Sequence, residues 1–336
     1  MILLQELYRT YWVELIALWV LLIMVIVLLR GIRANYEVAI NWFKLTQEFL
    51  ESNFSRSALM QKSFWMDSWS QFDIFATGRK NFSYVYMNVI CKPRQDILTG
   101  ILFQPFLRNY DKVYVEIPIQ RMGPIMILIC NKKELKSTLI EYPEIEIHCS
   151  PKKVNSLSKD TAIYANSNAC LDIIMDSGTI SKFISSKMVE RLVSYIYISD
   201  QTACPRLTNS YSKVTSVFKA CIRVPSKDDI NMMNELNFDL NYLFKHLLFL
   251  CEMLMTIDLP AKTVQYIANN RLQIEKTLNK INDNGVNERI EAKRREKIRS
   301  EAAKISRMSP KEQKKYQEKK EKQQARSRIK LKVSRS

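Results

Sequence analysis

Residues 15–29, LIALWVLLIMVIVLL, form a run from Leu15 to Leu29 that contains no charged side chain. Extended back to Tyr11, the run has 19 residues and a single acid, Glu14. At 1.5 Å per residue a helix of this length covers about 28 Å, close to the thickness of the hydrocarbon core of a bilayer. The stretch therefore predicts a helix that crosses a membrane.

The N-terminal border of the run has the residue types of a membrane interface. Tyr11 and Trp12 stand where interfacial aromatic side chains are expected, and Glu14 lies one turn further in. Glu14 could contact a polar residue of a partner in the membrane, or it could snorkel to the headgroups or stay protonated. Both interpretations fit the sequence.

The segment is expected to be a retained anchor over residues 1–33. It is longer than the apolar region of an ordinary signal peptide, and RGIR at 30–33 replaces the small residues of a cleavage site. Within twenty residues, Arg9 precedes the run, whereas Arg30, Arg33 and Lys44 follow it. The excess of positive charge predicts a short lumenal N-terminus and a cytosolic C-terminus.

Cysteine and histidine usage gives little support for a metal or disulfide framework. The seven cysteines are scattered, form no CxxC pair and are accompanied by two histidines. This pattern is typical of reduced thiols in a cytosolic core, and we expect no metal site and no cofactor. The glycosylation sequons at 53–55 and 81–83 would then stay unmodified, which tests the topology.

Residues 34–225 have the length and pattern of one cytosolic α+β domain. Runs rich in Val, Ile, Tyr and Phe predict strands at 72–77, 84–91, 113–119, 125–130, 145–149, 195–198 and 214–224. Helical patterns occupy 36–53, 132–141 and 179–195. Because several strands follow one another with few helices between them, a layered arrangement is expected rather than a doubly wound sheet.

An amphipathic helix is predicted at 236–259, and Pro260 would end it. Its charged residues are too frequent for a second membrane span. With a second helix at 263–281 it would form a helical hairpin within 230–284. The hairpin could cap the core, or it could be a wedge at the membrane surface or in a partner's groove. The apolar face in question is formed by Leu240, Leu243, Leu247, Leu250 and Leu254.

The segment 285–336 is expected to be a basic tail, helical and partly disordered. From residue 289 onward it carries 19 Lys and Arg and 6 Glu, a net charge of +13 out of +17 for the chain. Its apolar residues are too sparse for a coiled-coil seam. SPKE at 309–312 has the features of a helix start, so two exposed helices broken near Ser309 are predicted. Such helices have no core to hold them and need a partner.

This tail could be exposed to solvent alone, or it could bind one of two anionic partners, acidic lipid headgroups or the phosphate backbone of RNA. The charge extends over roughly 60 Å of potential helix, well beyond one Debye length of about 10 Å from a bilayer. RNA is therefore favoured, and for a membrane protein the RNA is most often that of a docked ribosome. The predicted ribosomal RNA contacts are Arg294, Arg295, Lys297, Arg299, Lys311, Lys314, Lys315, Lys319, Lys320, Lys322, Arg326 and Arg328.

No catalytic residue is expected. The triplet DSG at 176–178 resembles that of aspartic proteases, but it occurs once, and a turn at the start of a helix explains it more simply. There is no P-loop, no GxGxxG and no nucleophile elbow. These absences argue against an enzyme.

Four short strings occur in an order that resembles one known family. They are YWVE at 11–14, ESNF at 51–54, RQDIL at 94–98 and SDQ at 199–201. Together with the order of anchor, α+β domain, amphipathic helices and basic tail, they resemble calumin, the coiled-coil-domain subunit of the PAT complex (protein associated with the translocon). The likeness is clear in patches from residue 8 to 209 and compositional beyond.

The resemblance implies an endoplasmic reticulum protein that works with the small membrane subunit Asterix beside the Sec translocation channel, under a translating ribosome. There the complex shields polar transmembrane helices of nascent multipass proteins. The acidic, calcium-binding lumenal segment of the family has no counterpart in the ten or so residues before the run, where Glu6 is the sole acid, so calcium binding is not carried over. Either the segment is reduced in this member or the N-terminus of the sequence is incomplete. The expected function is a non-enzymatic biogenesis factor that acts as scaffold and ribosome tether. The alternative is a membrane-anchored scaffold that binds acidic lipids or a soluble partner without ribosomes.

Overall fold

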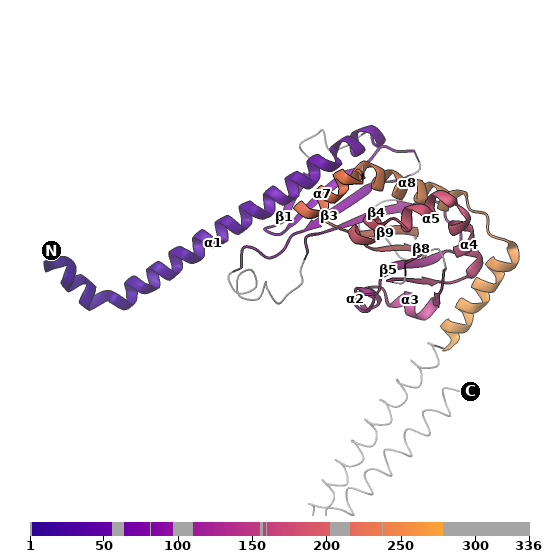
Figure 1. The fold of residues 1–336 in the computed structure, drawn as a ribbon. Helices are drawn as coiled ribbons and strands as arrows, with labels where there is room; N and C mark the ends of the chain where they lie inside the picture. Colours follow the sequence, from indigo (N-terminus) through magenta and orange to yellow (C-terminus); the bar gives the residue numbers. More distant parts are fainter. Residues whose placement is uncertain are drawn as a thin grey trace, which may run out of the picture. The chain divides into compact units, whose positions relative to one another are not determined.

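The computed structural model describes residues 2–55, 64–80, 82–96, 110–154, 157–158, 160–201, 216–236 and 238–277, with the backbone alone for residues 2–10. The chain divides into two units, Met1–Asn270 and Arg271–Ser336. Every helix and strand labelled in Figure 1 belongs to the first unit. The predicted basic tail lies outside the described residues and stays a prediction.

The first element is a single long helix, α1 (Ile2–Asn53), with non-helical backbone angles at Tyr11 (φ −122°, ψ 28°). Within the described part of the chain, its stretch from Tyr11 to Asn53 is the one helix long and apolar enough to cross a membrane, and none of its most apolar window is buried. The prediction of one long apolar N-terminal helix is confirmed. The helix continues without a linker into the domain, where Ala39, Trp42 and Phe49 are buried.

The domain is built on a nine-stranded sheet whose order is β1-β2-β3-β4-β9-β8-β5-β7-β6. Every neighbouring pair is antiparallel, in contrast to a doubly wound parallel sheet. The strands are β1 (Phe64–Ser68), β2 (Gln71–Ala76), β3 (Val85–Ile90), β4 (Lys112–Ile119), β5 (Met126–Asn131), β6 (Ser150–Lys152), β7 (Thr161–Ala165), β8 (Val193–Ser199) and β9 (Ser216–Arg223).

The helices that follow α1 are α2 (Leu135–Glu141), α3 (Pro143–His148), α4 (Asn168–Asp176), α5 (Gly178–Ile184), α6 (Lys187–Leu192), α7 (Lys227–Glu235) and α8 (Leu240–Thr256). The domain part of α1 and helices α4–α8 share one core with one face of the sheet. Helices α2 and α3 cover part of the other face and form a smaller core there (Figure 1).

The two cores follow from the alternation of side chains along each strand. In β4, Val113, Val115 and Ile117 point into the main core. Tyr114, between them, packs against the smaller core on the opposite face. This two-sided burial explains why several strands read as nearly continuous runs of Val, Ile, Leu and aromatic residues.

Helix α8 is held in the main core by its leucine face. Leu240, Leu243, Leu247, Leu250 and Leu254 are all buried. Phe244 of the same helix stacks on Phe49 of α1, with ring centroids 5.0 Å apart, and lies edge-on to Trp42 at 6.0 Å. The burial agrees with the first of the two interpretations, in which the helix caps the core. For the leucine face to contact a membrane or a partner, α8 would have to leave the core.

Some predicted elements differ from the structure. The strand predicted at 145–149 is wrong, because Pro143 starts a helix, α3, and Glu144 and Glu146 stabilise its first turn. The single helix predicted at 179–195 is instead α5 and α6, followed by β8. Strands β1, β6 and β7 and helices α4 and α7 were not predicted. Residues 261–277 are helical, but 278–281 of the predicted second helix lie outside the described residues, and the hairpin stays a prediction.

Candidate functional site: where the apolar helix meets the sheet

The apolar segment of α1 presents its side chains outward. Tyr11, Trp12, Glu14 and Leu29 are exposed, and Leu15 is half-buried. Tyr11 also marks the change of direction in the helix, so the predicted interfacial aromatic pair coincides with the kink. An outward-facing apolar surface is what a lipid environment requires. Contact of these side chains with another protein remains a prediction.

Just past the apolar run, Gly31 allows α1 to touch the main chain of the loop of residues 92–96. A Cβ atom at Gly31 would lie 2.4 Å from the carbonyl oxygen of Arg94 and 2.5 Å from the Cα of Gln95. No side chain fits at that distance from main-chain atoms. The helix and the loop can be this close only because residue 31 is glycine.

One turn further along α1, the side chain of Asn35 is fully buried and makes three hydrogen bonds. Its Nδ2 donates to the carbonyl oxygen of Trp69 (3.1 Å) and to Oε1 of Gln95 (3.0 Å). Its Oδ1 accepts a hydrogen bond from Nη1 of Arg94 (2.9 Å). Because these bonds replace those to water, the polar side chain can be buried, and it connects α1 to two different loops.

An ion pair closes the same network. Nη1 and Nη2 of Arg94 lie 2.9 and 2.7 Å from the two carboxylate oxygens of Asp111, and the backbone N–H of Lys92 donates to Oδ1 of Asp111 (2.8 Å). Burial alone would lower the pKa of Arg94, but its hydrogen bond to Asp111 and the charge of that carboxylate raise the pKa. The guanidinium thus stays charged inside a largely buried pair.

Cys91 packs into this network as a protonated thiol. Burial, with a contribution from the charge of Asp111, raises the pKa of Cys91 to about 12. Its Sγ lies 3.6 Å from the backbone oxygen of Asn35. We call Gly31, Asn35, Cys91, Arg94 and Asp111 together the junction clamp.

The junction clamp fixes the direction of the domain relative to the apolar helix. Helix α1 is continuous through the junction. Its first turns beyond the apolar run are hydrogen-bonded to the turn before β2, at Trp69, and to the loop after β3, at Gln95. Sequence analysis did not find these residues as a site. The available signal was a glycine inside a helical pattern, which costs about 1 kcal/mol relative to alanine and so indicates a packing constraint.

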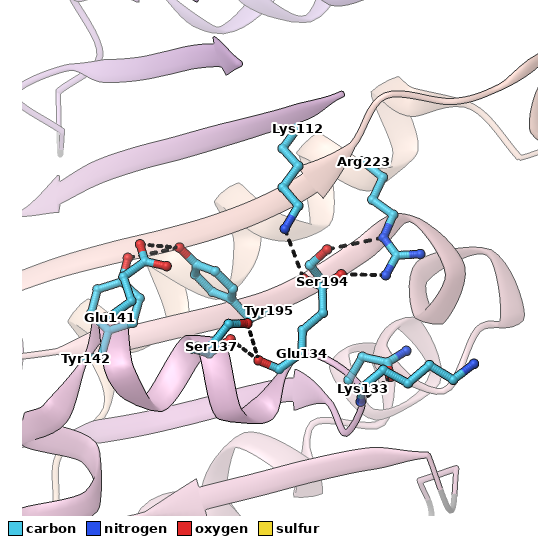
Figure 2. Close-up of polar contacts among 11 residues, drawn as sticks. Lys112, Lys133, Glu134, Ser137, Glu141, Tyr142, Ser194, Tyr195 and Arg223 are labelled. Carbon is cyan, nitrogen blue, oxygen red and sulfur yellow. Dashed lines mark hydrogen bonds and ion pairs between the residues drawn. The ribbon is translucent and has the colours of Figure 1, made fainter. Parts of the chain in front are cut away.

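A second polar cluster, on the opposite face of the sheet, joins α2 to the strands (Figure 2). Glu134 accepts hydrogen bonds from Nη2 of Arg223 (2.6 Å) and from Nζ of Lys112 (3.4 Å), and Nε of Arg223 donates to Oγ of Ser194 (3.4 Å). Burial by itself raises the pKa of Glu134, but the hydrogen bond from Arg223 and the charge of Lys112 outweigh it and lower the pKa.

Tyrosines continue this cluster under α2 and α3 (Figure 2). The hydroxyls of Tyr142 and Tyr195 share a 2.9 Å hydrogen bond, and Tyr195 donates to Oε1 of Glu141 (3.2 Å). Tyr197 stacks on Tyr142 and donates to Oε1 of Glu144 (2.6 Å). Burial raises the pKa of Tyr142 and of Tyr195, so both remain neutral hydrogen-bond donors. The cluster therefore attaches two helices to the sheet.

The DSG triplet, the cysteines and histidines, and the predicted RNA contacts were the other candidate sites in the sequence. In DSG at 176–178, Oγ of Ser177 accepts a hydrogen bond from the N–H of Ile180 (3.4 Å), and α5 begins at Gly178, as expected for a helix start. Among the residues that the structure describes, no three His, Cys, Asp or Glu side chains come together as metal ligands. The twelve predicted RNA contacts between Arg294 and Arg328 lie outside the described residues.

Within the described residues, one apolar helix long enough to cross a membrane continues directly into an antiparallel sheet domain, which is the arrangement of a single-span membrane-anchored protein. The family model described as PAT complex subunit CCDC47 matches residues 10–327, and the chain belongs to this family, which confirms the resemblance to calumin. None of the curated proteins compared with the chain matches it. The family and the apolar helix together indicate a single-pass protein of the endoplasmic reticulum membrane with a role in the PAT complex.

Proposed function

We propose that the chain is a non-enzymatic membrane-protein biogenesis factor, the scaffold and ribosome tether of a translocon-associated chaperone complex for multipass proteins. Membership of the PAT complex subunit family is the observation that carries this proposal. The rigid connection between α1 and the domain supports the scaffold role, because it would hold a cytosolic body in a fixed direction beside the membrane.

The proposed orientation places the N-terminus in the lumen and the C-terminus in the cytosol. The cations Arg30, Arg33 and Lys44 follow the apolar run, against Arg9 before it. In this orientation the sheet domain and the basic tail are on the same side as the ribosome. The predicted partners are an Asterix-like subunit, the Sec channel, the large ribosomal subunit and nascent multipass proteins.

The chaperone work is divided between subunits in this proposal. A polar side chain of a client helix costs a few kcal/mol when it faces lipid, and a partner that covers it gains that free energy. The outward surface of α1 from Leu15 to Leu29 is almost entirely apolar and offers few hydrogen bonds. The polar contacts to clients would therefore come from the small partner subunit, with this chain as its support.

Deletion of residues 289–336 tests the tether. The variant should lose cosedimentation with ribosomes, because it lacks +13 of the +17 net charge. A full-length variant in which glutamine replaces the Lys and Arg of the tail is the matched control, and it should lose binding equally. Tails that bind through many phosphate contacts lose roughly a thousandfold in affinity between about 50 and 200 mM salt.

Unchanged cosedimentation of both variants would refute the tether. Flotation of the intact chain with anionic liposomes, but no cosedimentation with ribosomes, would instead favour the alternative of an acidic-lipid scaffold.

A further inference from the structure

Two loops of the domain contact α1 just past the end of its apolar run. The loop of residues 92–96 touches Gly31, which is two residues past Leu29 and therefore about 3 Å along the helix. The backbone of Trp69 is bonded to Asn35, six residues past Leu29 and therefore about 9 Å along the helix. The headgroup layer extends roughly 5 to 8 Å beyond the hydrocarbon core on each side. For a helix that leaves the hydrocarbon core at Leu29, the first contact falls inside this layer and the second just beyond it.

The turn at Trp69 is the end of the β1–β2 hairpin that lies nearest to the apolar segment. Asn35 contacts this turn, whereas Phe43, two turns further along α1, packs against Phe64 at the other end of β1, with ring centroids 5.5 Å apart. Strand β1 therefore runs antiparallel to α1, and its turn is directed toward the side of the membrane. The position of the turn is fixed by the Asn35 hydrogen bond.

Exposed aromatic side chains occupy this end of the domain. The side chain of Trp69 is 51% exposed and that of Tyr36 is 44% exposed. Tyr36 packs against Phe64 and Phe72, whose ring centroids lie 6.3 and 6.1 Å from its own, so its ring lies along the hairpin rather than at the turn and Trp69 is the aromatic residue of the turn. Trp and Tyr combine an apolar body with a polar edge and are enriched where membrane meets water. A half-exposed tryptophan at the turn suits a lipid interface better than water.

Two exposed cations of α1 follow the apolar run next to this position, and the exposed acid Asp96 lies in the loop. Arg30 is exposed, and the exposed Arg33 reaches Glu37 on its own helix (3.2 Å). Lys92 begins the loop whose Arg94 is neutralised by Asp111. The cationic side chains beside the loop are those that phospholipid phosphates attract.

We propose that the turn at Trp69 and the loop of residues 92–96 form a second membrane contact, with the phospholipid headgroup layer as the ligand and the Trp69 indole inserted at its border. We call these residues the membrane collar. Because interfacial aromatic anchors set the tilt of a span, α1 would tilt toward the side of β1. The inference depends on α1 crossing a membrane and is independent of ribosome binding.

Depth-dependent quenching of a fluorophore tests the membrane collar. The full chain is placed in polymer-bounded phosphatidylcholine nanodiscs that contain a headgroup nitroxide lipid and no other protein. A thiol-reactive fluorophore is attached in W69C, W65C and I140C, and labelled wild type corrects for the native thiols. Trp65 lies on β1, about 13 Å from Trp69, and Ile140 is exposed on α2.

The expected result is loss of most of the fluorescence at position 69, a smaller loss at 65 and little at 140. Equal losses at the three positions, or equal quenching of 69 and 140 by aqueous iodide, would overturn the proposal. The W69C variant retains the backbone carbonyl that accepts from Asn35, and its thermal unfolding is compared with wild type to show that the junction clamp is intact. Since the nanodisc contains lipid alone, a partner protein cannot cause the loss at position 69.

Discussion

At Gly31 the absence of a side chain determines how closely the domain approaches the membrane helix. Replacing it by alanine, Gly31→Ala, would place a methyl group 2.4 Å from a main-chain carbonyl, which cannot rotate away. Overpacking of this kind costs about 1–3 kcal/mol of unfolding free energy. We expect thermal unfolding of the domain in detergent micelles to shift to lower temperature.

Gly178→Ala is the matched control for this prediction. No atom lies within 4 Å of the position its Cβ would take, at the start of α5. The substitution should be neutral or stabilise the fold by about 0.4–1 kcal/mol, because alanine restricts the unfolded chain more than glycine. Equal destabilisation by the two substitutions would contradict the close contact at residue 31.

The residues of the junction clamp could not be predicted from sequence for a physical reason. Asn35 and Gln95 are 60 positions apart, and Arg94 and Asp111 are 17 apart on either side of a long connection. Their hydrogen bonds have no local periodicity, because they depend on how α1 crosses the sheet. The apolar run could be predicted because its signal is contained in consecutive residues.

At the scale of elements, the Glu134 cluster makes the attachment of α2 depend on pH. The pKa of Glu134 is lowered below its ordinary value of 4.5 in the folded chain. Its ionised form therefore stabilises the fold fully above the unfolded pKa, and this stability is lost as the pH falls through the folded pKa. Glu134→Gln should cost about 1–3 kcal/mol at pH 7, through the weakened bonds to Arg223 and Lys112.

The difference in unfolding free energy between wild type and Glu134→Gln should shrink as the pH is lowered from 7 to 3, as measured by chemical denaturation. Glu235→Gln, at the exposed C-terminal end of α7, controls for the loss of one negative charge. A difference that stays constant over this pH range would mean that Glu134 is not stabilised as a carboxylate.

Periodicity identified some elements and misidentified others. Strands β2, β3, β4 and β5 were predicted close to their observed bounds, since each is a run of β-branched and aromatic residues between turn signals. The segment IEIH within α3 alternates like a strand, yet Pro143 and the acids of the first turn favour the helix. Strand β6 is three residues long and contains a proline, which is too little pattern to detect.

At the scale of the whole molecule, α1 is both the apolar span and part of the core of the domain. The span and the domain are therefore joined without a hinge. From Tyr11 to Leu29 most side chains of α1 are exposed, and further along the helix Trp42, Phe49 and Leu50 belong to the main core. The leucines of α8 pack against this second half, so the same core also fixes α8. Any tilt of the span is thus passed to the sheet, and the topology of α1 decides which compartment contains the domain.

That topology can be tested by glycosylation, although the native sequon at 53–55 is a poor reporter. Oδ1 of Asn53 accepts a hydrogen bond from Arg79 (2.6 Å), and its Nδ2 donates to the carbonyl of Phe49 (2.9 Å), so the acceptor amide is occupied in either compartment. Flexible acceptor tags fused to each terminus avoid this problem. In microsomes the N-terminal tag should be glycosylated and the C-terminal tag unmodified, because the cations past Leu29 keep that side in the cytosol. Glycosylation of the C-terminal tag alone would place the basic tail in the lumen, away from every ribosome, and would overturn the tether together with the orientation.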